Sequence, residues 1–350
     1  MHQDSSNNQN ILLVQSVQAC IAAELALALK LFSPKHFFHE ILNYSVCPPG
    51  KLFRPLLVWG VASDLAKRGL TPNDLTSSTA RNILTLSLAL EFHHAYSLVH
   101  DDLPSMDNDR YRRGKLATHA QYGEWQAILA GDGLLNLSYY CLSKIKSPNL
   151  QTLLAIMGHS LGPKGLVFGQ VMDLALDASK AHSVNAQDKS QDVDTILKIH
   201  ELKTARLFQV ALVGSFLLMT KAPQSLWSPG WRPYWKLGRS LGIVFQLLDD
   251  LAELCEGAPQ AHEDEVNPWP HHYHFLCKVI KQELGVIIKS SQTFDMQNLQ
   301  MVWHPYFASF IKTIEANQEK LFGALTKTQS LKKSDLKILM GALQGLDLKQ

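Results

Sequence analysis

Residues 94–114 read HAYSLVHDDLPSMDNDRYRRG, an apolar helical segment followed by acids and then by two arginines. Apolar side chains recur at three- and four-residue spacing over about 80–102, which is the pattern of a helix with a buried face. Pro104 disfavours helix at the residue before it, so we expect the helix to end near Asp101 and Asp102. The segment therefore predicts a long buried helix that presents carboxylates at its end.

The same periodicity fills most of the chain, and the alternating pattern of strands is hard to find. Helical patterns cover about 11–32, 55–65, 80–102, 124–145, 151–160, 194–219, 233–256 and 274–290, and less regular ones lie beyond 305. Loops are expected near 46–50, 104–118, 178–190, 222–232 and 257–273. No linker or shift in composition divides the chain. The sequence predicts an all-α fold, a single domain over residues 1–350 built as a bundle of about ten or more helices.

Composition excludes several classes of protein. Hydrophobic residues make up 46% and charged residues 18% of the chain, which suits a globular core and argues against disorder. A formal net charge of +2 does not favour nucleic acid as a partner. The five scattered cysteines form no C-x-x-C pair, which fits a reducing compartment.

The chain's beginning shows no secretory pattern. Residues 1–10, MHQDSSNNQN, are polar, lack an apolar core and are expected to be a flexible N-terminus. The longest apolar run, 207–219, is shorter than the ~18 residues of a membrane span. These features predict a cytoplasmic protein with no membrane span.

The acids at the end of the first motif are candidate metal ligands. Asp101 and Asp102 repel each other unless a cation lies nearby, and Asp107 returns from the following loop as a third carboxylate. Mg²⁺ binds carboxylate oxygens together with water and substrate phosphates, and Arg112 and Arg113 suit the remaining phosphate oxygens. A solvated helix end is the alternative interpretation.

A second acidic pair lies 148 residues further on. Asp249 and Glu253 are four residues apart on one helical face, with Asp250 beside them and Gln246 one turn earlier. Two acidic helix segments that face each other across a bundle cavity could hold a metal–diphosphate cluster. Alone, the second pair would also fit a solvated helical stripe.

Basic residues upstream complete the candidate site. Lys51 and Arg54 lie in GKLFRP, at the start of a helix where a phosphate is favoured. His94 shares its helix with Asp101 and Asp102. The alternatives are two solvated charges on a loop and an ordinary core histidine.

These residues resemble the trans-isoprenyl diphosphate synthase family, and most of all bacterial farnesyl diphosphate synthase (geranyltranstransferase). The segment 94–114 is similar to the family's first aspartate-rich motif, including its bacterial two-residue insertion. GKLFRP at 50–55 and GEWQAILAGDGLL at 123–135 are similar to its basic motif and to the helix after the first motif. Gly169, Gln170, Asp173, Lys203, Thr204 and Phe245 to Asp250 follow in the family's order, so the resemblance covers about 45–255.

The resemblance implies an isoprenoid synthase fold around a central cavity, several Mg²⁺ ions and a homodimer. It implies metal ligands at Asp101, Asp102, Asp107 and Asp249, with Asp250 and Glu253 as further candidates. It implies that isopentenyl diphosphate is bound by Lys51, Arg54, His94 and Arg113. It implies that the allylic diphosphate is bound by Arg112 and Lys203, and the allylic cation stabilised by Lys203, Thr204 and Gln246. The implied activity is condensation of dimethylallyl or geranyl diphosphate with isopentenyl diphosphate to give farnesyl diphosphate.

Several positions depart from the family pattern. Pro49 and Leu52 replace a glycine and an arginine of the basic motif, and Glu253 replaces an aspartate. Leu116 and Ala117 replace the proline and threonine after the arginine pair. The segment 255–275 lacks the family's lysine, and its histidines 271, 272 and 274 are not expected to bind metal.

Three functions therefore remain open. They are an active short-chain prenyltransferase, a non-catalytic or regulatory subunit of such an enzyme, and a class I terpene cyclase. Cyclases need no second diphosphate site, so the basic residues argue against the cyclase. Tyr96, five residues before Asp101 and about 7.5 Å along a helix, is the candidate floor that limits the product to C15; ordinary core packing is the alternative.

Overall fold

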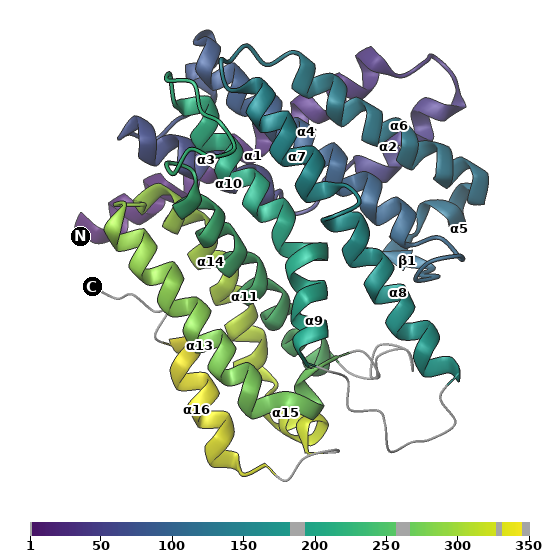
Figure 1. Cartoon of the computed structure of the whole chain (residues 1–350), viewed down its shortest axis with the longest axis vertical. Coiled ribbons are helices and arrows are strands. Elements are labelled where there is room, and N and C mark those ends of the chain that lie inside the picture. The colour runs from purple at the N-terminus through teal and green to yellow at the C-terminus, as the bar shows by residue number, and fades with distance from the viewer. Residues whose placement is uncertain (1, 183–192, 257–266, 327–330, 345–350) are drawn as a thin grey trace. The chain divides into compact units, whose positions relative to one another are not determined.

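The protein is described by a computed structural model that covers residues 2–182, 193–256, 267–326 and 331–344. Helices form nearly all of the described chain, and one short hairpin supplies its strands (Figure 1). The prediction of an all-α fold is confirmed. Two compact units divide the chain, and each is described by itself below.

The first unit comprises residues 1–157, 210–232 and 297–302. Its elements are α1 (His2–Phe32), α2 (Phe37–Val46), α3 (Phe53–Ala66), η1 (Pro72–Thr76), α4 (Ser78–Asp101), β1 (Tyr111–Arg112), β2 (Lys115–Leu116), α5 (Thr118–Tyr122), α6 (Glu124–Ser143) and most of α7 (Leu150–Leu161). The second unit comprises residues 158–209, 233–296 and 303–350. It contains α8 (Leu166–His182), α9 (Val193–Ile199), a π-helical turn (His200–Ala205), most of α11 (Arg232–Glu256), α13 (Trp269–Thr293), most of α14 (Gln297–Ala316), α15 (Gln318–Leu325) and α16 (Lys333–Gln344). The helix α10 (Arg206–Met219) continues the π-helical turn.

Helix α4 forms the centre of the first unit. Ser77 caps its start by accepting a hydrogen bond from the backbone N–H of Ala80 over 3.1 Å. Side chains around most of its circumference are buried, including Leu86, Leu90 and Phe92. It packs against α3 and α6, and Figure 1 shows α6 alongside it. Because α4 is enclosed, the groups at its C-terminal end are held in fixed positions.

The helix that carries Lys203 and Thr204 is continuous from α9 through the π-helical turn into α10. Helix α11 approaches this turn closely, because a Cβ atom on Gly242 would lie 2.4 Å from the Cα of Ala205. Helix α8 does the same from Gly169, where a Cβ atom would lie 2.7 Å from the backbone nitrogen of Lys203. The turn is thus enclosed by two neighbouring backbones.

Several elements differ from the sequence-based prediction. Helices α2 and α8 lie outside the predicted helical ranges, and α13 begins at Trp269 inside the loop predicted for 257–273. Pro270 is tolerated in the first turn of a helix, and the buried Trp269 and Tyr273 anchor that turn in the core. The three histidines of this segment therefore lie within α13, which kinks at His272, while residues 257–266 lie outside the described part of the chain.

In the described part of the chain, two helices are long and apolar enough to cross a membrane by length and composition, which by itself is weak evidence for a span. In the helix Val193–Met219, 78% of the apolar window is buried, as expected for a core helix. In Leu13–Phe32 only 28% is buried.

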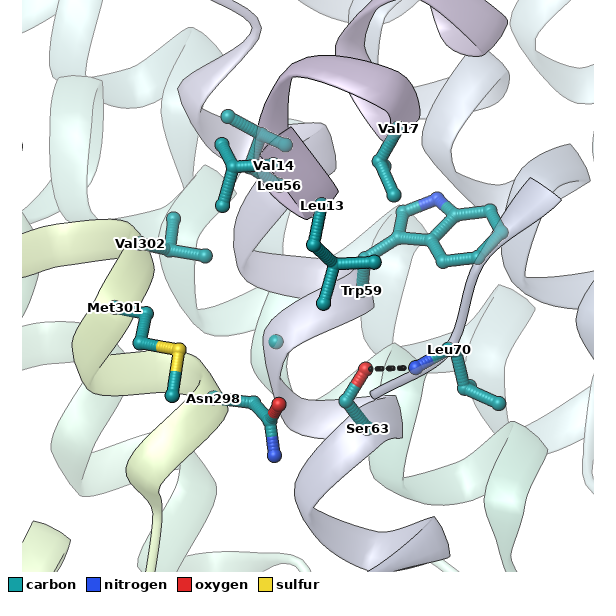
Figure 2. A pocket seen from close by; sticks show the side chains of 11 residues that line it. Leu13, Val14, Val17, Leu56, Trp59, Ser63, Leu70, Asn298, Met301 and Val302 are labelled. Carbon is teal, nitrogen blue, oxygen red and sulfur yellow. Dashed lines mark hydrogen bonds between the residues drawn. The ribbon is translucent and has the colours of Figure 1, made fainter. Parts of the chain in front are cut away.

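A small pocket lies within the first unit between α1, α3 and the start of α14 (Figure 2). Its volume is about 30 Å³, and Leu13, Val17, Leu56 and Trp59 are among its lining residues. The hydroxyl of Ser63, which lines the pocket, accepts a hydrogen bond from the backbone N–H of Leu70 over 2.9 Å. An apolar space of this size is a packing defect rather than a site for a diphosphate.

The single-domain organisation, the central cavity and the flexibility of residues 1–10 stay predictions.

Candidate active site

The end of α4 brings two of the predicted metal ligands together. After Asp101 the chain turns back, and the backbone N–H of Asp107 donates to the carbonyl oxygen of Asp101 over 2.9 Å. Both residues are partly exposed. The turn therefore places two carboxylate-bearing residues side by side at the helix end, as the sequence predicted from Pro104.

Asp102 is placed differently from Asp101. It is buried, and its Oδ1 accepts a hydrogen bond from Nε of Arg112 over 2.9 Å. The Nη2 of Arg112 also pairs with Asp109 over 2.8 Å. Burial raises the pKa of the Asp102 carboxyl, although Arg112 opposes the rise. In this arrangement Asp102 orients the arginine, and its role as a metal ligand stays a prediction.

A two-stranded hairpin carries the arginine pair. Strands β1 and β2 pair antiparallel, with Arg112 opposite Lys115, and Arg113 and Gly114 form the turn. Both turn residues have positive φ, 54° and 75°, which matches the twist of a tight hairpin. A left-handed backbone costs a residue other than glycine about 1–2 kcal/mol, so Arg113 is held there by its surroundings. The sequence analysis did not predict these strands.

Arg54, His94 and Arg113 form a basic cluster in the first unit. The Nη1 of Arg54 lies 3.1 Å from Nε2 of His94. The guanidinium of Arg113 lies against Gly50, because a Cβ atom there would be 2.6 Å from its Cζ. Burial, followed by the neighbouring arginines, holds the pKa of His94 well below its usual value. A neutral imidazole can accept a hydrogen bond from Arg54 and so orient it, while Lys51 is exposed at the same loop.

Glu91, which the sequence analysis missed, lies one turn before His94 on α4. It is 4% exposed, and burial raises its pKa despite the opposing charges of Arg54 and Arg113. The two arginines oppose this rise and favour the charged form of the buried acid. Its signal in the sequence is weak, since it is a single charge within a buried helix.

Tyr96 is buried on α4 between two histidines. Its ring lies edge-on to His93, with centroids 4.6 Å apart, and to His100, with centroids 5.7 Å apart. Burial, Asp101 and Tyr139 raise the pKa of its hydroxyl to about 12, so the phenol is neutral. The three rings lie in a row on one face of α4, next to Asp101. The position suits a floor below the acids, and that role stays a prediction.

The second unit gathers Lys203, Thr204 and Gln246. The ammonium of Lys203 pairs with Asp173 on α8 over 2.8 Å. The hydroxyl of Thr204 donates to Oε1 of Gln246 on α11 over 2.8 Å. The π-helical turn thus connects to helices on both of its sides through the residues expected to contact the allylic group.

Asp250 is buried on α11, and its carboxylate contacts neighbouring side chains. Gln246 donates to its Oδ1 over 2.8 Å, while its Oδ2 has no hydrogen-bond partner among the described residues and lies 3.6 Å from Nε2 of His200. Burial raises the pKa of Asp250 well above its usual value, helped by Glu253 and Asp249. Burial also lowers the pKa of His200 to about 4. The sequence analysis missed His200.

Asp249 and Glu253 share a face of α11. Asp249 is half-buried and Glu253 is exposed. Acids of both units are therefore accessible, but among the described residues no group of three or more His, Cys, Asp and Glu could hold a metal ion alone. Such a site fits Mg²⁺, which is commonly held by one or two carboxylates plus substrate phosphates. Asp101 and Asp107 fit that chemistry best in the first unit, and Asp249 in the second. That the two acidic segments face each other stays a prediction.

Comparison with known proteins places this arrangement in a family. The polyprenyl synthetase family model matches residues 35–264, so the chain belongs to the polyprenyl synthetase family. Farnesyl diphosphate synthase from Micrococcus luteus is 33% identical over 218 residues, which is 62% of this chain and 66% of that protein. Geranylgeranyl diphosphate synthase from Cyanophora paradoxa is 31% identical over 222 residues, again 62% of this chain and 66% of that protein. The matched region thus spans slightly less than two thirds of these relatives' length.

Solved structures support the fold. A geranyltransferase from Legionella pneumophila superposes with a TM-score of 0.66 at 24% identity, over 90% of this chain and 98% of that chain. A geranyltransferase from Helicobacter pylori gives a TM-score of 0.62 at 24% identity, over 84% of this chain and 98% of that chain. The isoprenoid synthase fold implied by the first aspartate-rich motif is therefore confirmed.

Proposed function

We propose that the chain is a Mg²⁺-dependent prenyl diphosphate synthase. It joins an allylic diphosphate, dimethylallyl or geranyl, to isopentenyl diphosphate and releases farnesyl diphosphate and inorganic diphosphate. The observation that carries the proposal is the first unit's pairing of two features: adjacent acids at Asp101 and Asp107, and the basic cluster of Arg54, His94 and Arg113. The first suits a metal-bound diphosphate, and the second suits a diphosphate bound by side chains.

Bound Mg²⁺ would neutralise the allylic diphosphate and favour ionisation of its C–O bond. Asp101, Asp107 and Asp249 are the residues that would hold it. Arg112, fixed by Asp102, and Lys203 take the remaining phosphate oxygens of the allylic substrate.

The isopentenyl diphosphate is held by Lys51, Arg54, His94 and Arg113. After the C–O bond has ionised, its double bond attacks the allylic cation, and the new cation loses a proton to the departed diphosphate. The hydroxyl of Thr204 and the side-chain oxygen of Gln246 are oriented by their mutual hydrogen bond and stabilise positive charge on the allylic group.

The relatives include both farnesyl and geranylgeranyl synthases, so product length is argued from Tyr96. Its ring is buried beside Asp101 and backed by His93. The buried Tyr96 ring, with the ring of His93 edge-on to it, is proposed to limit the chain to C15.

The partner in assembly is a second copy of the chain. The ring centroids of Phe32 and Tyr140 lie 4.6 Å apart, and those of Phe37 and Trp125 lie 6.5 Å apart. These contacts join α1, α2 and α6 into one face. Large apolar side chains exposed there are Leu27, Leu31, Phe32, Phe37, Trp125, Ile128, Leu129, Tyr139 and Tyr140. Homodimers bury such faces. Sedimentation should therefore show a dimer, and Leu129→Glu should shift it to monomer. The enzyme is proposed to be cytoplasmic, with no nucleic-acid partner and no membrane span.

A non-catalytic or regulatory subunit is the second candidate, favoured by the replacement of an aspartate by Glu253 and by the lack of a lysine in 255–275. A class I terpene cyclase is opposed by the basic cluster, which a cyclase does not use.

One assay separates these functions. Purified protein is mixed with Mg²⁺, geranyl diphosphate and labelled isopentenyl diphosphate, and extracted label is identified by chromatography. Label in farnesyl diphosphate supports the synthase. Binding of both substrates without product supports the subunit, and a hydrocarbon formed from an allylic diphosphate alone supports the cyclase.

A further inference from the structure

The π-helical turn that carries Lys203 and Thr204 has a second, charged side. Glu201 in the same turn accepts a hydrogen bond from Nη2 of Arg206 over 2.9 Å. Its other carboxylate oxygen lies 3.4 Å from Nε of Arg239 on α11. One acid therefore links the turn to the start of α10 and to the helix that carries Asp249.

Arg239 continues this link to a third helix. Its Nη1 donates to Oε1 of Glu283 on α13 over 2.7 Å. The other oxygen of Glu283 accepts a hydrogen bond from the hydroxyl of Ser240 over 2.5 Å. Glu283 is 7% and Ser240 is 1% exposed, so Arg239 is held at this end by buried residues. We call Glu201, Arg239 and Glu283 the charged brace.

A π-helical turn needs such support. It lacks the regular hydrogen-bond ladder of an α-helix and is found most often at functional sites. Close approach of Gly169 and Gly242 limits movement of its backbone, but a glycine contact does not fix rotation about the helix axis. The charged brace adds to the Lys203–Asp173 and Thr204–Gln246 contacts a third side-chain link between the turn and its neighbours, through Glu201.

We propose that Arg239 is a positioning residue, which holds the π-helical turn through Glu201 and thereby places Lys203 and Thr204 for the allylic substrate. This inference rests on the proposed function for its kinetic part only. The described contacts of Arg239 are with Glu201 and Glu283, and it is not among the residues proposed to bind either substrate. Its guanidinium fork contacts two acids at once, which a lysine ammonium at the same position cannot reproduce.

The kinetic consequence is selective. A displacement of about 1 Å in a positioning group costs on the order of a hundredfold in rate. Arg239→Gln should therefore lower kcat at least tenfold and raise KM for the allylic diphosphate. The KM for isopentenyl diphosphate should stay within twofold, because its residues belong to the first unit. Arg239→Lys should recover part of the loss.

The chain offers a matched control. Lys198 also approaches Glu201, at 3.5 Å, but its side chain is 47% exposed and contacts no other member of the brace. Lys198→Gln should leave kcat and both KM values unchanged. Glu201→Gln weakens the brace from the side of the turn and serves as a second variant if Arg239→Gln does not fold.

The test combines kinetics with amide hydrogen exchange of the full-length chain, read in a peptide covering 200–206. Faster exchange in Arg239→Gln and Glu201→Gln, but not in Lys198→Gln, together with the selective loss supports the proposal. Equal exchange, or an equal rise in both KM values, overturns it. If the wild-type chain makes no product, the proposed function fails, and the exchange comparison still decides whether the charged brace holds the turn.

Discussion

Arg112 donates from Nε to Oδ1 of Asp102 over 2.9 Å, so the second aspartate of the first acidic pair is bound to the arginine ten residues later. The contact joins the end of α4 to the hairpin. The two adjacent acids differ in their surroundings: Asp101 is partly exposed at the helix end, whereas Asp102 is buried.

Asp102→Asn should lower turnover about a hundredfold, because Arg112 loses its orientation toward the allylic diphosphate. The asparagine can still accept a hydrogen bond, and Arg112 is partly exposed, so we expect a loss of about 1–2 kcal/mol in unfolding free energy. Steady-state kinetics and urea unfolding measure both quantities. An Asp102→Asn protein with wild-type KM for the allylic substrate and wild-type kcat would refute the positioning of Arg112.

Tyr96→Ala should let the product grow to C20 or longer. Removal of the ring opens space above His93, while the fold is retained because the change leaves a cavity costing about 3–5 kcal/mol. Chain length is read by chromatography of the dephosphorylated products. Tyr139→Ala, a nearby aromatic change, is the control and should keep C15; an unchanged C15 pattern in Tyr96→Ala would rule out the floor.

The allylic diphosphate should bind more weakly than isopentenyl diphosphate and should require Mg²⁺ steeply. Glu253 is longer than an aspartate, and Lys203 already pairs with Asp173, so fewer protein cations are available to that substrate. The acids Glu263, Asp264 and Glu265, expected to add opposing charge, lie outside the described residues.

Separate calorimetric titrations of each substrate at several Mg²⁺ concentrations measure this difference. Tight allylic binding at low Mg²⁺ would show that the site is more complete than this account holds. Binding of isopentenyl diphosphate should change little with Mg²⁺, because side chains alone hold it.

Lowering the pH should reduce the free energy of unfolding, because the buried His93 resists protonation in the folded state. Burial lowers its pKa to about 3, and neither ring nitrogen has a hydrogen-bond partner among the described residues. In the unfolded chain the imidazole titrates near 6.5, so below that pH the unfolded state binds a proton that the folded state does not. Stability is thus fully present above pH 6.5, and its loss at pH 4.5 is about 3 kcal/mol.

His93→Leu tests this assignment, because leucine cannot take up a proton. Urea unfolding at pH 7 and 4.5 should show a smaller acid-induced loss in the variant, by about 3 kcal/mol. His200, whose pKa burial lowers to about 4, contributes equally in both proteins. The same pH dependence with and without His93 would contradict the assignment.

Local patterns in the sequence predicted the fold well where a helix buries one face or ends at a proline. The helix before Asp101 and its turn toward Asp107 follow from periodicity and from Pro104. The sequence predicted that helix α13 begins near 274, whereas it begins at Trp269. Three histidines and Pro270 interrupt the apolar pattern to which the buried Trp269 and Tyr273 belong.

Contacts between distant residues could not be predicted in the same way. Glu201 and Arg239 lie 38 residues apart and Arg239 and Glu283 lie 44 apart, and nothing local distinguishes these residues from solvated charges. The pairing of Asp102 with Arg112 depends on the hairpin, whose strands are two residues long and leave no alternating pattern. Residue types were sufficient to propose the site, but the side-chain partners described above required the structure.

The most direct test of the central claim is condensation measured in matched proteins, wild type and Asp101→Ala. With Mg²⁺, geranyl diphosphate and labelled isopentenyl diphosphate, the wild type should form farnesyl diphosphate, and chelation with EDTA should stop it. Asp101→Ala should keep the wild-type circular dichroism spectrum and melting temperature within a few degrees, yet lose turnover by about a thousandfold, as expected when a group acting on transition-state charge is removed. Near wild-type turnover in Asp101→Ala, or turnover that persists in EDTA, would contradict the account.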